Sequence, residues 1–299
     1  LGANTTGTRN VAVGDYTLDA NTDDNDSTAL GYAALTHSTG SHNTCVGSSA
    51  GYNVTTGQYN TIVGSAAGDA ITTGSENTAM GYGALTSATI GDQNTAIGRG
   101  AMRDNTTGYY NVAVGYLALD KNTTADRNTA CGYEALKNNT TGSNCVAVGN
   151  RALHAHTTGY ENTAIGSRAG DTLTNGYRNC FMGEDAGDDI TTGHNNVIIG
   201  RQADGSHSGS AGQVVIGAAL TGKGDYTGYY AGSSGVYNSD NTSTWQTTSD
   251  IRIKKNIVDN NIGLDKINQI RVRNFEYRTP EEVDPSLPSH SAIDKQGIQ

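Results

Sequence analysis

The sequence predicts an all-β fold: a β-solenoid, or β-roll, of 17-residue repeats, followed by a shorter segment of different character. Two observations lead to this prediction. Glycine, alanine and asparagine recur at fixed positions of a 17-residue period, which is the signature of a repeat architecture. The content of glycine, proline and charged residues then changes abruptly near Ser249.

The composition explains why repetition is needed. The 299 residues include 40 glycines, and only 35% of residues are hydrophobic and 16% charged. Such a chain has too little large aliphatic material for an ordinary core, yet too little charge to be disordered. Stacked repeats compensate because they bury small side chains against one another.

The composition also argues against several functions. A formal net charge of −10 disfavours nucleic acid and anionic membranes as main partners. No apolar run approaches the roughly 20 residues that span a bilayer. The cysteines at Cys45, Cys131, Cys145 and Cys180 have neither metal-site nor disulfide-framework spacing. We therefore expect no metal, no cofactor and no nucleic-acid partner.

Each repeat is marked by the glycine that ends a run of the type Asn-Thr-Ala-Ile-Gly, which we call the anchor glycine. Successive anchors are 17 residues apart, except for one interval of 16. The anchors are Gly14, Gly31, Gly47, Gly64, Gly81, Gly98, Gly115, Gly132, Gly149, Gly166, Gly183, Gly200 and Gly217.

Other residues hold fixed positions relative to the anchor. Asparagine usually lies four residues before it, and a further glycine commonly lies ten residues after it, behind a Thr-Thr pair. The unbroken alanine column three residues after the anchor predicts a tight place, where a larger side chain would collide with an opposing strand or chain. Its members are Ala34, Ala50, Ala67, Ala84, Ala101, Ala118, Ala135, Ala152, Ala169, Ala186 and Ala203.

Each repeat is expected to form one coil that consists of a strand, a tight corner, a short strand and a turn. A run such as residues 95–98 is too short for a helix, and each glycine would cost about 1 kcal/mol inside one. Stacking places alanine on alanine and asparagine on asparagine, so that side-chain amides form ladders. With about 4.8 Å between strands, the coils predict a rod on the order of 60 Å long.

The chain divides into three parts. Residues 1–217 form the repeat shaft, residues 218–248 a neck, and residues 249–299 a second object. All three prolines lie in this last part, and its eight basic and eight acidic residues cancel. The whole net charge of −10 therefore belongs to residues 1–248.

Over roughly residues 8–218, the repeats resemble the left-handed β-roll of trimeric autotransporter adhesin heads and the Gly- and Asn-rich repeats of phage tail fibres. The 17-residue period is longer than the usual adhesin repeat, which leaves the coil path open. The resemblance implies a homotrimer. Small interiors also fill better when three chains share an axis, which favours the same assembly.

Residues 249–299 carry a more specific resemblance. The run S-D-x-R-x-K-x-N-I over residues 249–257 is similar to the opening of the intramolecular chaperone auto-processing domain of phage tail spikes and fibres, including endosialidases. A short helix over residues 264–270 and a strand over 272–277 would follow in the order of that family. The resemblance implies the N-terminal part of a small α+β chaperone domain.

This resemblance also implies a single self-cleavage of the Thr248–Ser249 bond, with Ser249 as nucleophile and Lys254 as base, and no activity on external substrates. Lysine accepts a proton only where burial or nearby cations lower its pKa from about 10.4. Arg252 and Lys255 would supply such charges. In the family, the domain trimerises, aligns the shaft and cuts itself free, which leaves the trimer kinetically trapped.

A retained domain is the alternative to cleavage. The chain ends at Gln299, where the family continues into a further strand and a long helix. If residues 249–299 stay in the mature particle, the uncleaved domain would serve as the fibre tip.

Aromatic residues supply candidate glycan-binding positions. Tyr229, Tyr230, Tyr237 and Trp245 cluster in the neck and could stack on sugars. The tyrosines that follow anchor glycines are expected to pack at coil corners instead; they are Tyr32, Tyr82, Tyr116 and Tyr133. His154 and His156 fall in a turn, and a metal held by their six imidazoles in a trimer is the less favoured interpretation.

These patterns favour a structural protein of a virion: an extracellular tail fibre that contacts other tail or baseplate proteins and attaches to a host-surface glycan or protein receptor. A bacterial trimeric surface adhesin is the alternative, and such a chain would end in a coiled coil and a membrane β-barrel. A glycan-cleaving tailspike is least favoured, because no arrangement of catalytic carboxylates is visible.

Overall fold

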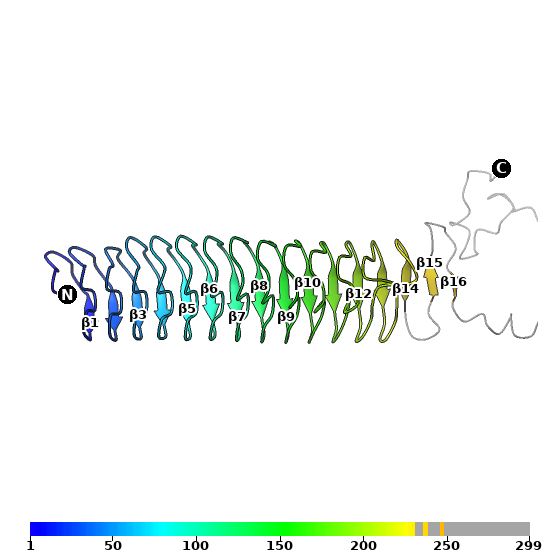
Figure 1. The fold of residues 1–299 in the computed structure, drawn as a ribbon, viewed down its shortest axis with the longest axis horizontal. Helices are drawn as coiled ribbons and strands as arrows, with labels where there is room; N and C mark the ends of the chain where they lie inside the picture. Colours follow the sequence, from blue (N-terminus) through cyan, green and yellow to red (C-terminus); the bar gives the residue numbers. More distant parts are fainter. Residues whose placement is uncertain (231–235, 239–245, 248–299) are drawn as a thin grey trace, which may run out of the picture. The chain divides into compact units, whose positions relative to one another are not determined.

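The computed structural model describes residues 1–230, 236–238 and 246–247. Over residues 1–230 the chain winds into a regular β-solenoid (Figure 1). This confirms the predicted all-β solenoid of 17-residue repeats. The described residues contain no helix, and so none long and apolar enough to cross a membrane.

Within the described residues the strands form one sheet of 16 strands, ordered as in the chain. From β1 to β14 neighbours are parallel, and the register shift is usually one 17-residue repeat, as for Thr95 and Val112. The last three strands pair antiparallel. The strands are β1 (Val11–Val13), β2 (Thr28–Leu30), β3 (Thr44–Val46), β4 (Thr61–Val63), β5 (Thr78–Met80), β6 (Thr95–Ile97), β7 (Val112–Val114), β8 (Thr129–Cys131), β9 (Val146–Val148), β10 (Thr163–Ile165), β11 (Cys180–Met182), β12 (Val197–Ile199), β13 (Val214–Ile216), β14 (Gly228–Tyr230), β15 (Val236–Asn238) and β16 (Gln246–Thr247).

The second short strand expected in each coil is not found among the described coils, and that expectation is wrong. The backbone instead adopts left-handed angles two and four residues after the anchor, as at Glu134 (φ 54°) and Leu136 (φ 50°). Because a strand requires negative φ, this alternation turns the segment into a continuous bend. Hydrogen bonds to the next coil continue through the bend, for example from Leu136 N to Ala152 O at 3.0 Å.

The core is a column of side chains inside the coils. The middle residue of every strand from β2 to β13 is fully buried, as are all eleven alanines of the predicted column. Large and small residues compensate along the stack: the ring of Phe181 occupies the space where a Cβ at Gly170 or Gly187 would lie. The described coils of a single chain therefore close their own interior.

The anchor glycines are required by the closeness of the coils. Gly98 has φ of 134°, and a Cβ at this position would lie 2.3 Å from the carbonyl oxygen of Gly115 in the next coil. No other residue fits both the backbone angle and the space.

The predicted asparagine ladder runs through the core. Asn94 Nδ2 donates to Asn77 Oδ1 at 3.3 Å and to Gly108 O at 2.9 Å. Asn94 Oδ1 accepts from both N and Nδ2 of Asn111, at 3.0 and 3.2 Å. Each rung thus satisfies buried backbone groups as well as the neighbouring amide, which makes it costly to remove.

Cys145 replaces asparagine in this ladder, and a second polar column compensates. That column stacks Asn105, Asn122, Asn139 and His156. His156 Nδ1 lies 3.0 Å from Asn139 Oδ1, and Nε2 lies 3.1 Å from Nδ2 of Asn162, which belongs to the first ladder. Because Asn139 Oδ1 can only accept and Asn162 Nδ2 can only donate, the imidazole is neutral with its proton on Nδ1. Burial lowers the pKa of His156 to about 4.

Replacing Asn94 by alanine should destabilise the solenoid by about 3 kcal/mol, because it leaves the buried backbone N of Asn111 without its acceptor and removes one of the two side-chain donors to Gly108 O. Urea unfolding followed by circular dichroism measures the loss. The control is Asn53→Ala, which removes an exposed amide and should change stability by less than about 0.5 kcal/mol. Equal losses in the two variants would contradict the role of the ladder.

His156 should make the solenoid sensitive to acid. Its pKa is about 4 in the folded chain against the ordinary 6.5, so its contribution is complete above pH 6.5 and is lost as pH falls towards 4. Over this pH range the wild type should lose about 3 kcal/mol of its free energy of unfolding through His156. Burial raises the pKa of Asp204 to about 6, so protonation of this carboxyl adds stability as pH falls. The difference in stability between wild type and His156→Asn therefore isolates the effect of the imidazole.

The measurement is the free energy of unfolding of both proteins between pH 7 and pH 4. The asparagine variant should lose less stability than the wild type on acidification, since asparagine occupies the equivalent place in the three preceding coils. Parallel pH profiles would show that the imidazole is not held neutral.

Candidate functional site

The predicted self-cleavage residues Thr248, Ser249 and Lys254 lie outside the described residues, as does Trp245. Only the backbone of Tyr237 is described, in β15. The roles of these residues stay predictions.

Two tyrosines of the predicted glycan-binding cluster lie in β14. Tyr229 is 4% exposed and belongs to the hydrophobic core, and the Lys223 ammonium lies 4.8 Å from its ring centroid. Tyr230 is partly exposed. The ring of Tyr229 therefore contributes to closing the end of the solenoid.

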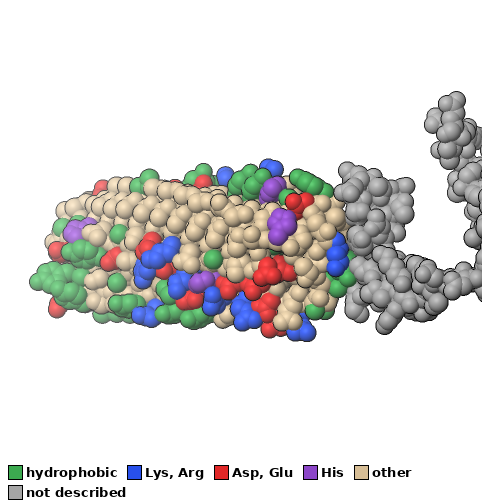
Figure 2. Space-filling view, turned by 45° about the vertical axis from the view of Figure 1, so that its right-hand side comes forward, with side chains coloured by type: hydrophobic (Ala, Val, Ile, Leu, Met, Phe, Trp, Pro, Cys, Tyr) green, Lys and Arg blue, Asp and Glu red, His purple; other side chains and the backbone are tan. Residues whose placement is uncertain are grey.

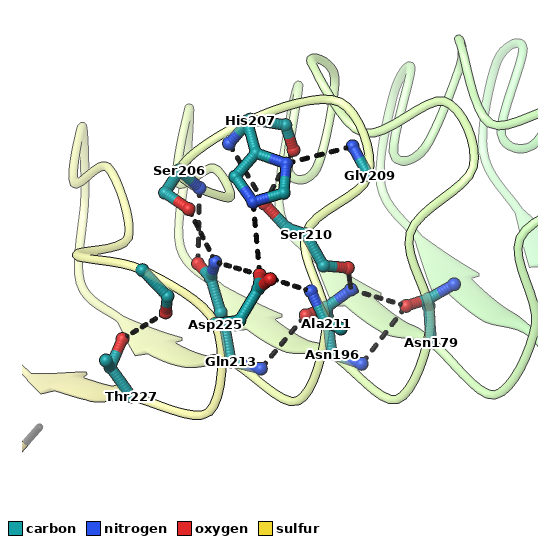
Figure 3. A network of polar contacts seen from close by, with 11 residues as sticks. Asn179, Asn196, Ser206, His207, Gly209, Ser210, Ala211, Gln213, Asp225 and Thr227 are labelled. Atoms are coloured by element: carbon teal, nitrogen blue, oxygen red, sulfur yellow. Dashed lines mark hydrogen bonds and ion pairs between the residues drawn. The ribbon is translucent and has the colours of Figure 1, made fainter. Parts of the chain in front are cut away.

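A polar network completes the asparagine ladder at this end (Figure 3). Gln213 takes the ladder position, and its backbone N donates to Asn196 Oδ1 at 2.9 Å. The longer side chain reaches Ser206, with Nε2 donating to Oγ at 2.7 Å and Oε1 accepting from the backbone N at 3.2 Å. Asp225 accepts from the backbone N of Ala211 at 2.9 Å, the main cause of its lowered pKa.

Ser210, His207 and Asp225 of this network have the residue types of a hydrolytic triad, but not its geometry (Figure 3). Ser210 Oγ donates to the backbone oxygen of His207 at 2.6 Å. The imidazole of His207 is engaged elsewhere: Nδ1 accepts from Gly209 N at 3.2 Å and Nε2 lies 3.1 Å from Asp225 Oδ1. Since no base among the described residues contacts the serine hydroxyl, we interpret the network as closing the solenoid.

An apolar stripe runs along the outer face of the sheet. The third residue of each strand points away from the core, and no residue at this position is charged. Many of these side chains are well exposed, including Val13 at 54% and Met182 at 42%. The stripe consists of Val13, Leu30, Val46, Val63, Met80, Ile97, Val114, Cys131, Val148, Ile165, Met182, Ile199 and Ile216.

The stripe is flanked by the first residues of β1 to β13, seven of which are threonine and the others valine or cysteine. At about 4.8 Å per strand and 3.3 Å per residue, the face measures roughly 60 Å by 10 Å, or about 600 Å². The apolar stripe makes up part of this area, and the largest apolar patch on a soluble monomer, typically about 300–600 Å², is often functional. A surface of this kind is typical of a protein interface.

Charged side chains follow a separate band along the solenoid (Figure 2). They pair between neighbouring coils, as Lys121 with Asp104 at 2.7 Å and Arg103 with Asp120 at 3.1 Å. Asp120 is almost fully buried, and burial raises the pKa of its carboxyl despite the two nearby cations. The ion pairs of this band therefore link neighbouring coils.

Neither predicted histidine forms a metal site with its described neighbours. His156 belongs to the polar column, and His154 lies 3.5 Å from both Glu134 and Asp171. Within the described coils, no group of three His, Cys, Asp or Glu side chains has the arrangement of a metal site.

The tyrosines that follow the anchors differ from expectation. Tyr32 and Tyr82 are 58% and 61% exposed, so they do not pack at the corners. Tyr116 and Tyr133 stack on each other between coils, with ring centroids 5.3 Å apart and an interplanar angle of 13°. The bend after each anchor turns these side chains outward.

Comparison of the sequence with models of protein families gives no match, and comparison with curated proteins gives none either. The apolar stripe is the functional feature that sequence reasoning did not identify. Its signal was the recurring Val, Ile, Leu or Met directly before the anchor glycine.

Proposed function

We propose that the chain is the shaft of a homotrimeric viral tail fibre used in host attachment, followed by a chaperone segment that trimerises and cuts itself free. The apolar stripe is the observation that carries the proposal for the shaft. A stable protein interface buries about 800 Å² on each partner. The roughly 600 Å² of the sheet face, together with the side chains at its margins, approaches this size.

Another copy of the same chain is the partner that fits the stripe best. The apolar side chains repeat with every strand along the sheet. Only a partner with the same repeat spacing can match such a surface over its whole length, and a parallel copy has that spacing by construction. The lack of charge on the stripe suits a contact in which identical residues meet, because like charges would repel there.

Cyclic symmetry is the arrangement that brings identical residues to the same height. The number three follows from the resemblance of the repeats to adhesin heads and tail fibres. The run at residues 249–257 supports a chaperone that aligns the three chains. A closed core in each chain and an apolar seam between chains would together make a stiff shaft.

Cys131 lies on the stripe and provides a test of this assembly. Cys45 and Cys145 are buried, so a Cys180→Val variant leaves Cys131 as the one exposed thiol of the described residues. Mild oxidation should form a disulfide between two of the three chains of each trimer, because their Cys131 thiols meet across the seam. Non-reducing electrophoresis detects the dimer, and light scattering should give three times the mass that the same chain shows under denaturing, reducing conditions.

The matched control moves the thiol to another face. In a chain that also carries Cys131→Ser, Thr124→Cys places a cysteine at an exposed position of the threonine turn, remote from the stripe in the coil, and should give no dimer. An antiparallel pair would not bring Cys131 against Cys131. A monomer mass, or equal cross-linking at position 124, would contradict the proposal.

Self-cleavage is tested on the full gene product. Its mass under denaturing conditions should correspond to two fragments divided between Thr248 and Ser249, and Ser249→Ala should give one uncut chain. Lys254→Met should also prevent cleavage, because it removes the proposed base without changing the nucleophile. An uncut wild-type chain would make residues 249–299 a retained tip.

A further inference from the structure

An open groove of about 450 Å³ lies on the N-terminal coils, over the bends that follow the first three anchor glycines. Its volume falls within the roughly 300–1,000 Å³ that small-molecule sites occupy. The groove is lined by Tyr16, Tyr32, Ala33, Thr36, Ser49 and Tyr52.

Aromatic rings form the walls of this groove. Tyr16 and Tyr32 are 61% and 58% exposed, and their rings meet edge to face with centroids 5.8 Å apart. Tyr52 contacts the ring of His37 at 4.7 Å, also edge to face. In each pair the edge of one ring lies against one face of the other, and the partner ring leaves the remaining ring faces uncovered. Ring faces left open to water are suited to the apolar face of a ligand.

Hydroxyl groups supply the polar part of the groove. Within the described residues, no hydrogen bond involves the side-chain hydroxyls of Tyr16, Tyr32, Tyr52 or Ser49. Thr36 Oγ1 donates to the backbone oxygen of Tyr16 at 3.0 Å, which fixes the floor. A hydroxyl can both donate and accept, so these groups can pair with the hydroxyls of a sugar while its apolar face lies on a ring.

The charge of the site restricts the class of ligand. The lining includes no Asp, Glu, Lys, Arg or His, and the chain has a net charge of −10, which repels acidic ligands. We propose that this groove binds a neutral oligosaccharide, with one hexose or N-acetylhexosamine unit stacked on Tyr32. The inference rests on the proposed attachment function and names the class of its ligand.

The groove is compatible with the proposed trimer, because it shares no residue with the apolar stripe. In the second coil the stripe residue is Leu30, directly before the anchor glycine, and the groove residue Tyr32 lies directly after that glycine. A bound sugar would lie at the margin of the seam.

Tyr82 offers a matched control. It has the same position relative to its anchor and is 61% exposed. It is not among the residues that line the groove. Its ring also has the guanidinium of Arg99 at 5.8 Å, whereas no cation of the described residues lies over the ring of Tyr32.

The test uses the full chain on a printed array of neutral, sialylated and sulfated oligosaccharides, followed by calorimetric titration with the best-bound neutral compound. Tyr32→Ala should weaken its binding about tenfold, as expected for the loss of one aromatic contact. Tyr32→Phe keeps the ring and should retain most of the affinity. Tyr82→Ala should bind as the wild type does.

Absence of binding to neutral sugars, binding of acidic sugars alone, or an equal loss in Tyr32→Ala and Tyr82→Ala would overturn the inference. The mass of the same preparation in solution distinguishes a failure of the groove inference from a failure of the proposed trimeric fibre. A trimer without neutral-sugar binding would overturn the groove alone. A monomer that binds through Tyr32 would overturn the trimeric fibre and leave the groove assigned.

Discussion

The structure depends on the hydrogen bonds that tie each coil to the next in a fixed register. Side chains at the same position of successive repeats lie directly above one another, so one asparagine can satisfy its counterpart and the backbone groups beside it. Asn94, for example, links the coils of Asn77 and Asn111 in this way. A slip by one residue would leave several buried polar groups unpaired in every coil, which is a large penalty. This register aligns the alanine column, the anchor glycines and the outward side chains, and all surfaces of the molecule follow from it.

The same register converts small local features into long surfaces. A single Val or Ile before an anchor glycine is unremarkable on a protein surface, but the fixed stacking places such residues in line over the whole sheet. The charged band arises similarly, from pairs such as Lys121 and Asp104 in adjacent coils. The aromatic groove is the exception, because Tyr16, Tyr32 and Tyr52 come together only in the first coils. A periodic surface suits assembly with identical chains, whereas a local irregularity suits recognition of a separate ligand.

The sequence was sufficient to predict the coils, because glycine, alanine and asparagine at a 17-residue spacing constrain the stack strongly. The second strand was predicted wrongly for a physical reason. Residues such as Leu136 adopt left-handed backbone angles that leucine rarely takes, and the residue types at these positions do not indicate such angles. The stripe was missed because three-residue strands are too short to show which alternate residues face inward. Exposure of Tyr32 depends on the same unforeseen bend. The roles of Ser249 and Lys254 rest on resemblance, since these residues lie outside the described part of the chain.

The replacement of a ladder asparagine by Cys145 has a mechanical consequence. A pull along the solenoid axis is transmitted through every interface between coils in series, so the interface with the fewest hydrogen bonds sets the breaking force, and additional coils cannot raise it. At Cys145 the amide rung is reduced to the bond from its backbone N to Asn128 Oδ1 and a weak sulfur contact. The hydrogen bonds from Asn139 through His156 to Asn162 provide a second connection between the coils beside Cys145. The imidazole thereby distributes tension between the two polar columns, beside the backbone hydrogen bonds that join the same coils, such as Thr129 N to Cys145 O at 2.8 Å.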